Sequence, residues 1–281
     1  FEKRYSLHTI DAYNNDLQQW LHYIEKEYEI NTISQVSAPI IRSWLVSMME
    51  SGISARSVNR KITALKSFYR FAIRAGHVQE NPMLKVSSPK TPKKLPVYVE
   101  AQKLDQLLDN TAFPEGFEGL RDRTILELLY GTGIRRAELL QLQIRDIDLR
   151  NNQIKVTGKR NKQRVVPLFP ELAEVISQYL ALRNTIPGDS DALLIREDGT
   201  EMYAGLIYRI VKKYLSLISS HQKRSPHVLR HSFAREMLNN GADLNAIKEI
   251  LGHANLSATQ VYTHNTIEKL KKAYDKAHPR A

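Results

Sequence analysis

The stretch SPHVLRHSFA, residues 225–234, opens the helical last fifth of the chain and concentrates basic side chains near its start. His227 and Arg230 are three residues apart at a predicted helix start, so their side chains face the same side of that helix. From Pro226 to Ala281 the pattern stays helical with short breaks. This stretch therefore predicts an imidazole and a guanidinium that one helix presents together.

Three further stretches combine glycine turns with basic or aromatic residues. They read GTGIRRAELLQL (131–142), VTGKRNKQRVVPL (156–168) and LGHANLSATQVYTH (251–264). Taken singly, none decides a function, because an arginine such as Arg135 after a glycine turn is usually a surface charge and Lys159 in a hairpin turn is usually solvated. Tyr262 is one of 13 tyrosines. Only the combination of these residues can indicate a function.

Most of the rest of the chain has helical patterns. These patterns cover residues 6–28, 38–50, 54–76, 100–110, 119–130, 135–142, 170–183 and 203–219. Between residues 152 and 168, Ile154 and Val156 alternate with polar residues, and Val165 and Val166 follow a polar turn, which predicts two short strands. The expected fold class is mainly α with a small β-sheet.

The helix predicted over residues 54–76 has an apolar side and a basic side. The apolar side consists of Val58, Ile62, Leu65, Tyr69 and Ala72. The basic side contains Arg56, Arg60, Arg70 and Arg74. We expect the first side to form a core and the second to lie against DNA phosphates or major-groove edges; an ordinary solvated surface is the alternative.

A proline- and lysine-rich stretch separates two predicted domains. Residues 82–96 read PMLKVSSPKTPKKLP, which is typical of an extended basic linker. We therefore predict a helical DNA-binding domain over residues 1–85, a linker over 86–97 and a second domain over 98–281. The linker lysines Lys90, Lys93 and Lys94 are further candidates for DNA contacts.

Charge and composition narrow the classes of function. The chain has 281 residues, with 41 Lys and Arg against 30 Asp and Glu, a net charge of +11 that indicates a polyanionic partner such as nucleic acid. The absence of cysteine excludes disulfides, iron–sulfur clusters and cysteine nucleophiles. No apolar run approaches the roughly 20 residues that span a bilayer, so we expect a cytoplasmic protein with no membrane segment.

Metal and nucleotide sites are not indicated. His227 and His231 are four residues apart but lack the glutamate of an HExxH zinc site. The glycine turns at 131–133 and at Gly158-Lys159 do not match G-x-x-x-x-G-K-[ST], the phosphate-binding loop of many ATPases. We expect neither a metal nor a nucleotide cofactor.

Taken together, the stretches resemble the active site of a known family. The ordered set consists of Arg135, Lys159, His227, Arg230, His253 and Tyr262. This set closely resembles the active site of the tyrosine recombinases, the lambda-integrase-like family of DNA strand-transfer enzymes. HVLRHSFA, LNNGADLNAIKEILGHANLSATQVYTH and the final HPRA look most like the Xer subfamily, which resolves chromosome dimers.

The resemblance implies a fold, an activity and partners. It implies a helical, SAM-like core-binding domain followed by a mixed α/β catalytic domain that ends in an exchange helix. It also implies metal-independent cleavage and rejoining of duplex DNA through a 3′-phosphotyrosine, with dimer resolution at a dif-like site. The implied partners are a homo- or hetero-tetramer on paired sites, a paralogous recombinase and a DNA translocase activator. A phage or mobile-element integrase, or a DNA-binding protein without catalysis, are the alternatives.

The six residues suit the breaking of a phosphodiester. Guanidinium groups such as those of Arg135 and Arg230 can stabilise the negative charge on the non-bridging oxygens. At pH 7 about one tyrosine phenol in a thousand is ionised, a deficit of roughly 4 kcal/mol that positive charge or a base near Tyr262 must offset. The leaving 5′ oxygen requires an acid, a role that suits Lys159.

Two departures from the family pattern affect individual assignments. Arg136 stands where relatives commonly carry a small or apolar residue, so either Arg135 or Arg136 could face the phosphate. Glu138, three residues after Arg135, favours Arg135, because family members usually have a supporting acidic residue there. Lys162 and Arg164 lie close enough to Lys159 to be mistaken for the acid; Lys159 is favoured by the G-K step after the first strand.

The tail has an apolar stripe that leaves two arrangements open. Ile267, Leu270 and Tyr274 recur at helical spacing. The helix can fold back on its own domain, or, as the resemblance implies, dock into the neighbouring protomer of a tetramer. The second arrangement predicts that removal of residues 266–281 spares single-site DNA binding and impairs cooperative binding.

Overall fold

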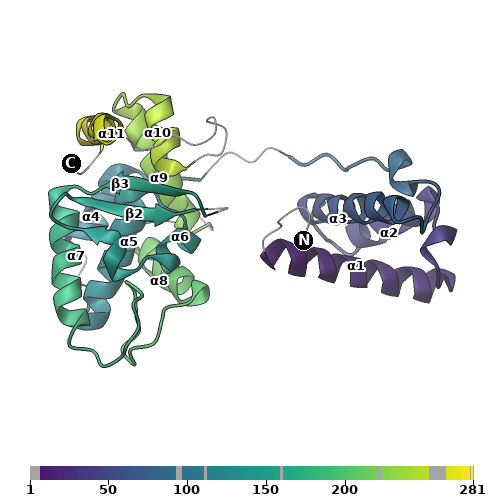
Figure 1. The fold of residues 1–281 in the computed structure, drawn as a ribbon, viewed down its shortest axis with the longest axis horizontal. Coiled ribbons are helices and arrows are strands. Elements are labelled where there is room, and N and C mark those ends of the chain that lie inside the picture. Colours follow the sequence, from purple (N-terminus) through teal and green to yellow (C-terminus); the bar gives the residue numbers. More distant parts are fainter. Residues whose placement is uncertain are drawn as a thin grey trace. The chain divides into compact units, whose positions relative to one another are not determined.

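The chain forms two compact units, Phe1–Lys94 and Leu95–Ala281, each with its own hydrophobic core (Figure 1). A computed structural model describes residues 7–92, 97–110, 113–158, 161–219, 223–252, 264–278 and 280. The division between the units falls within the stretch that the sequence predicts to be a linker.

The first unit is helical over its described residues, 7–92. Its elements are α1 (Leu7–Tyr28), η1 (Ile33–Gln35), α2 (Ala38–Glu50), α3 (Ala55–Arg74) and η2 (Pro82–Lys85), where η denotes a 3₁₀ turn. The helices begin and end close to their predicted bounds because the capping residues set them. At the start of α3, for example, the Ser54 hydroxyl accepts a hydrogen bond from the backbone N–H of Ser57 at 3.4 Å.

The apolar side of α3 forms the core of the first unit as predicted. Val58, Ile62, Leu65, Tyr69 and Ala72 are all buried. They pack with two tryptophans, Trp20 on α1 and Trp44 on α2, whose rings lie 5.1 Å apart. The chain contains 2 tryptophans, so both lie in this unit. Tryptophan fluorescence therefore reports on the first unit alone.

The described part of the second unit combines helices with a small antiparallel sheet. Its helices are α4 (Ala101–Asn110), α5 (Phe117–Thr132), α6 (Arg136–Gln141), α7 (Pro170–Arg183), α8 (Ala204–Ile218), α9 (Pro226–Asn239), α10 (Leu244–Leu251) and α11 (His264–Ala277), with the turn η3 (Ile144–Asp146). The sheet has the order β1 (Ile147–Asp148), β2 (Gln153–Thr157), β3 (Gln163–Pro167). The predicted fold class, mainly α with a small sheet, is confirmed.

Helix α5 lies at the centre of this unit and packs against α7, α8 and α9 (Figure 1). The predicted turn at residues 131–133 is wrong in part, because α5 continues through Thr132 and ends at Gly133. Gly131 is helical and buried, and a Cβ there would lie 2.8 Å from the Phe169 ring. Gly133 has φ +62° and a Cβ there would lie 2.4 Å from the Phe233 ring, so both its conformation and its packing require glycine.

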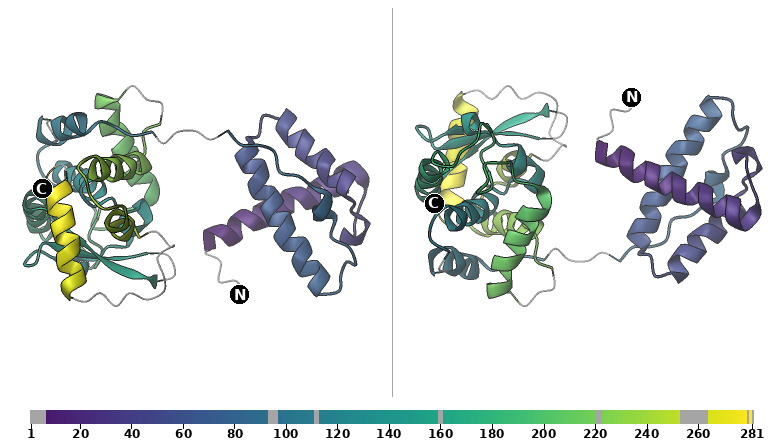
Figure 2. Two further views of the ribbon diagram at one scale, coloured as in Figure 1. Left: turned by 90° about the horizontal axis from the view of Figure 1, so that it is seen from above. Right: turned by 90° about the horizontal axis from the view of Figure 1, so that it is seen from below.

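The tail helix α11 packs on its own unit, against α9, α10 and β3 (Figure 2). Leu270 and Tyr274 are buried, and the Tyr274 hydroxyl donates to the Gly131 carbonyl at 2.6 Å. The chain end is held as well, since the Arg280 guanidinium donates to Asp109 at 2.7 Å. The structure thus has the first of the two predicted arrangements. Truncation at residue 266 would expose a core face, contrary to the expectation of an intact truncated domain.

Candidate active site

Arg135 stands directly before α6 and is held by a carboxylate of that helix. Glu138 accepts the backbone N–H of Arg135 on Oε2 at 2.8 Å and the Arg135 Nη1 on Oε1 at 2.7 Å. The three-residue spacing allows this, because a glutamate in the first helical turn can reach back to the N-cap backbone. The backbone and the guanidinium of Arg135 are therefore fixed by one side chain.

A second arginine binds the same carboxylate from the sheet. Arg164, on β3, donates from Nη1 to Glu138 Oε1 at 3.1 Å and from Nη2 to Oε2 at 2.8 Å. Burial alone would raise the pKa of Glu138, but the hydrogen bonds and charge of Arg164, with the bonds from Arg135, hold that pKa below its ordinary value. Glu138 is thus a carboxylate at neutral pH.

Arg230 reaches the site from α9. Its guanidinium is buried and donates to the carbonyl of Gly133 at 2.5 Å and to that of Leu251 at 2.7 Å. Burial, followed by the positive charge of Arg135, lowers the pKa of Arg230 to about 10. Arg230 is therefore still a cation at pH 7.

The last carbonyls of α10 accept from all three arginines. Arg164 Nε donates to Ile250 at 2.6 Å, and Arg135 donates from Nη1 to Leu251 and from Nη2 to Gly252, both at 3.3 Å. Such carbonyls have no partner within the helix and form the negative end of its dipole, which suits cations. Arg135 and Arg230 share the Leu251 oxygen, so residues from three parts of the sequence meet at one point.

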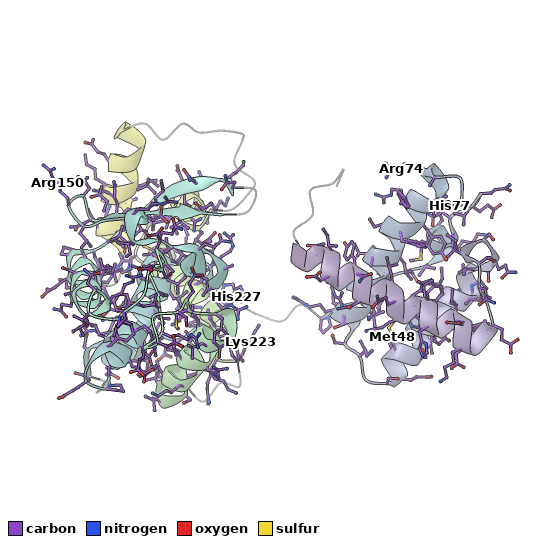
Figure 3. All side chains as sticks on the ribbon, turned by 60° about the horizontal axis from the view of Figure 1, so that its bottom comes forward. Met48, Arg74, His77, Arg150, Lys223 and His227 are labelled. Atoms are coloured by element: carbon purple, nitrogen blue, oxygen red, sulfur yellow. The ribbon has the colours of Figure 1, made fainter. Side chains whose placement is uncertain are left out.

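His227 lies at the start of α9 on the same side of the second unit as Lys223 (Figure 3). Its side chain is in part exposed to solvent and in part covered by the protein. Partial burial, with the charges of His231, Arg136 and Arg230 and finally Lys223, lowers the pKa of His227 below 6.5. His227 is therefore neutral at pH 7 and able to accept a proton.

Lys159, His253 and Tyr262 lie outside the described residues. The glycines before two of them are described and lie against the Glu138–Arg164 pair. A Cβ on Gly158 would lie 3.3 Å from Glu138 Oε1, and a Cβ on Gly252 would lie 2.9 Å from Arg164 Nη1. The residues directly before Lys159 and His253 therefore lie beside the arginine cluster, which consists of Arg135, Arg164 and Arg230.

Arg136 and Arg135 point to different partners. Arg136 Nη1 donates to the carbonyl of Ala204 at 3.2 Å, at the start of α8. Arg135 instead shares the Leu251 oxygen with Arg230. This difference supports Arg135 as the arginine that faces a phosphate together with Arg230.

The candidate DNA-binding residues differ in exposure and in the partners that the structure describes for them. Arg56, Arg70, Arg74 and Lys90 are exposed, and Lys93 and Lys94 lie outside the described residues. Arg60 is also exposed, but its guanidinium donates to the carboxylate of Asp16 and to the carbonyl of Ala12. Because Asp16 partly neutralises it, Arg60 is a weaker candidate for a phosphate contact than the sequence indicates.

A buried ion pair in the first unit was not predicted. Lys61 on α3 is buried and donates to Asp16 at 2.7 Å and to Gln19 at 2.6 Å. The sequence does contain an indication of this ion pair, because Lys61 falls between Val58 and Leu65 on the apolar side of α3. A charge at such a position requires a buried partner.

The described residues contain no group of three or more His, Cys, Asp or Glu side chains that could hold a metal ion. No described helix is both long and apolar enough to cross a bilayer.

Comparison with known proteins assigns both units to one family. A model described as the phage integrase family matches residues 98–269, and one described as phage integrase, N-terminal SAM-like domain, matches residues 1–76. The chain belongs to the phage integrase family.

Relatives and solved structures agree with this assignment. The tyrosine recombinase XerC of Chlorobaculum parvum is 37% identical over 300 residues, covering 97% of this chain and 89% of the relative. The tyrosine recombinase XerD of Staphylococcus haemolyticus is 37% identical over 286 residues, covering 100% and 95%. The crystal structure of the XerH site-specific recombinase bound to difH substrate, a pre-cleavage complex, matches with 26% identity and a TM-score of 0.74, covering 95% and 79%. The chain is therefore a site-specific tyrosine recombinase.

Proposed function

We propose that this recombinase cleaves and rejoins duplex DNA through a 3′-phosphotyrosine formed by Tyr262, and that it resolves chromosome dimers at a dif-like site. One observation supports the chemistry above all: Arg135 and Arg230 donate to the same Leu251 oxygen, immediately before Gly252-His253. Two guanidinium groups beside one another form the clamp that a pentacoordinate phosphorus requires.

The two arginines stabilise the charge of the transition state. As Tyr262 attacks phosphorus, negative charge grows on the two non-bridging oxygens. Arg135 and Arg230 are charged throughout this step, and the surrounding protein already holds them in place, so little reorganisation is needed. The cluster carries positive charge beyond what Glu138 neutralises.

Proton transfer is divided among the remaining residues. Neutral His227 accepts the phenolic proton of Tyr262, and His253 assists. The bond between phosphorus and the leaving 5′ oxygen breaks as Lys159 donates a proton to that oxygen. The energy of the broken ester is kept in the phosphotyrosine, so rejoining needs no nucleotide cofactor.

The first unit holds the DNA. Its exposed arginines Arg56, Arg70 and Arg74 on α3, and the lysines Lys90, Lys93 and Lys94, contact backbone phosphates or groove edges. Four protomers, of this chain alone or with a paralogous recombinase, assemble on paired sites in the cytoplasm, and a DNA translocase activates them.

The dimer-resolution role is favoured over that of a mobile-element integrase by the relatives named XerC and XerD, which match nearly the whole chain. The binding site can be selected from randomised duplex DNA and then located in the genome. This experiment distinguishes dimer resolution from the integration of a mobile element. A single chromosomal site supports dimer resolution, and sites at the ends of an element support integration.

Tyr262→Phe tests the chemistry. On a nicked duplex that carries the selected site, the intact chain should form a covalent protein–DNA complex that withstands detergent. The variant should form none while binding the duplex within a few-fold of the intact chain, since only one hydroxyl is lost. Tyr203→Phe, at an exposed tyrosine on the N-terminal side of α8, is the matched control and should cleave normally. Covalent complex from Tyr262→Phe would place the nucleophile elsewhere, and none from the intact chain would indicate a binding protein without catalysis.

A further inference from the structure

Arg164 is the least exposed of the three arginines Arg135, Arg164 and Arg230. Its side chain is 5% exposed, against 37% for Arg135. It belongs to β3 and is paired with Val156 of β2, on the hairpin that leads to Lys159. All the hydrogen bonds from its guanidinium described above go to protein groups, Glu138 and Ile250. Arg164 is thus placed to act on neighbouring residues rather than on DNA.

The hydrogen bonds of Glu138 are shared equally between two arginines. Oε1 accepts Nη1 of Arg135 and Nη1 of Arg164, while Oε2 accepts the backbone N–H of Arg135 and Nη2 of Arg164. A carboxylate has about four acceptor sites, so Glu138 is saturated. Arg135 consequently gives Glu138 only one of its guanidinium nitrogens.

Without Arg164, the negative charge of Glu138 would act on Arg135 alone. Glu138 would then be a buried anion with Arg135 as its remaining ionic partner, and the geometry favoured by such a pair is bidentate. A guanidinium turned toward Glu138 would offer fewer donors to a phosphate. Its charge would also be largely neutralised by the carboxylate.

Arg164 also lies between the two glycines that precede Lys159 and His253. The closest approaches are those of a Cβ on Gly252 to Arg164 Nη1 at 2.9 Å and of a Cβ on Gly158 to the same atom at 3.6 Å. Its Nε fixes the Ile250 carbonyl two residues before Gly252. One side chain therefore contacts both segments.

We propose that Arg164 is a positioning residue for strand cleavage: it occupies Glu138 so that the Arg135 guanidinium stays available to the scissile phosphate, and it aligns the hairpin and the α10 end with that guanidinium. The proposal rests on the proposed role of Arg135.

The first test compares Arg164→Lys with a matched change at another buried arginine. Arg183→Lys is the control, because Arg183 is also buried but donates to the carbonyls of Ser190 and Ala192, outside the cluster. With the nicked duplex carrying the selected site, Arg164→Lys should cleave about 10- to 100-fold more slowly, since an ammonium cannot form the fork and small misplacements are costly. Both variants should bind the duplex within a few-fold of the intact chain, and Arg183→Lys should cleave at a near-normal rate.

A second test has a readout that a merely structural role would not change. In Arg164→Met, Glu138 should capture Arg135, so the added change Glu138→Gln should restore at least part of the lost cleavage. A double variant no faster than the single one would overturn the proposal.

Two further variants, Glu138→Gln and Arg135→Ala, complete the test. If neither single Arg164 variant folds, the double variant is compared with Glu138→Gln alone; similar cleavage supports the proposal, and a drop of about tenfold or more overturns it, because Arg164 would then act through other groups. If Arg135→Ala cleaves normally, the proposed role of Arg135 fails as well. If Arg135→Ala is inactive and Arg164→Lys equals Arg183→Lys, only the role of Arg164 fails.

Discussion

Arg60, on the exposed side of α3, donates a hydrogen bond to the carboxylate of Asp16, which is buried on α1. The exposed arginines of α3 are therefore not equivalent. Arg60 joins two helices of the first unit, whereas exposed Arg56, one turn earlier, has no described ion pair. A change at Arg56 should therefore mainly weaken phosphate binding, whereas a change at Arg60 should mainly lower the stability of the first unit.

Changing Arg56 and Arg60 to glutamine one at a time tests this separation. Arg56→Gln should reduce the slope of log binding constant against log salt concentration by about 0.9, the value for one phosphate contact. Arg60→Gln should reduce it less and should lower the denaturation midpoint of the first unit, measured by tryptophan fluorescence. Binding of the full chain to labelled random-sequence duplex provides the slopes. Equal slope changes with unchanged midpoints would show that Asp16 does not hold Arg60 in solution.

The lowered pKa of His227 predicts how cleavage depends on pH. A base must be neutral to accept a proton, so activity is lost as the pH falls through the pKa of His227. Because that pKa lies below 6.5, the cleavage rate should fall to half only at a pH below 6.5, whereas a base with the ordinary value would have lost half of it at pH 6.5. Lys223→Gln removes one nearby positive charge and should move the decline to higher pH.

Arg150→Gln is the control for that shift, because Arg150 lies away from His227 and Lys223 in the same unit (Figure 3). It removes the same charge and should leave the pH profile unchanged. Titration of the His227 imidazole by NMR gives the pKa directly. A pKa at or above 6.5 in the intact chain would contradict the prediction.

The packing of α11 on its own unit predicts a large stability effect at Tyr274. Tyr274→Ala removes a fully buried ring and should lower the free energy of unfolding of the second unit by about 3–5 kcal/mol. Tyr274→Phe keeps the ring and leaves the Gly131 carbonyl without that donor, which should cost about 1–3 kcal/mol. Circular dichroism follows the loss, while the tryptophan signal of the first unit should not change. If Tyr274→Ala unfolds like the intact chain, α11 does not pack on its own unit in solution.

Much of the fold could be predicted because it depends on local patterns. The apolar spacing on α3, the serine at its start and the alternation in β2 each follow from a few neighbouring residues. Strand β1 has only two residues, Ile147 and Asp148, too few for an alternating pattern. The sequence pattern ends α5 too early, because Gly131 allows close packing against Phe169 and is not part of a turn.

The site was predicted as a set of residue types, but its internal contacts were not. From the sequence, Lys159, Lys162 and Arg164 are three similar cations on one hairpin. Their difference arises from which face of β3 is buried, and adjacent Val165 and Val166 leave that choice open. Arg164 shares the buried face with Val166, and only tertiary contacts with Glu138 and Ile250 make a charge acceptable there.

Three arginines, from α9, β3 and the start of α6, all donate to the last carbonyls of α10. This shared set of acceptors limits where segments can be exchanged between two enzymes of the family. One residue inserted within α10 would rotate the residues after it by about 100° about the helix axis relative to those before it, and the carbonyls of Ile250, Leu251 and Gly252 would turn away from their donors. A chimera between two members of the family should therefore take the whole block from Arg135 to Gly252 from one parent. Junctions placed outside this block leave the contacts of the three arginines with α10 intact.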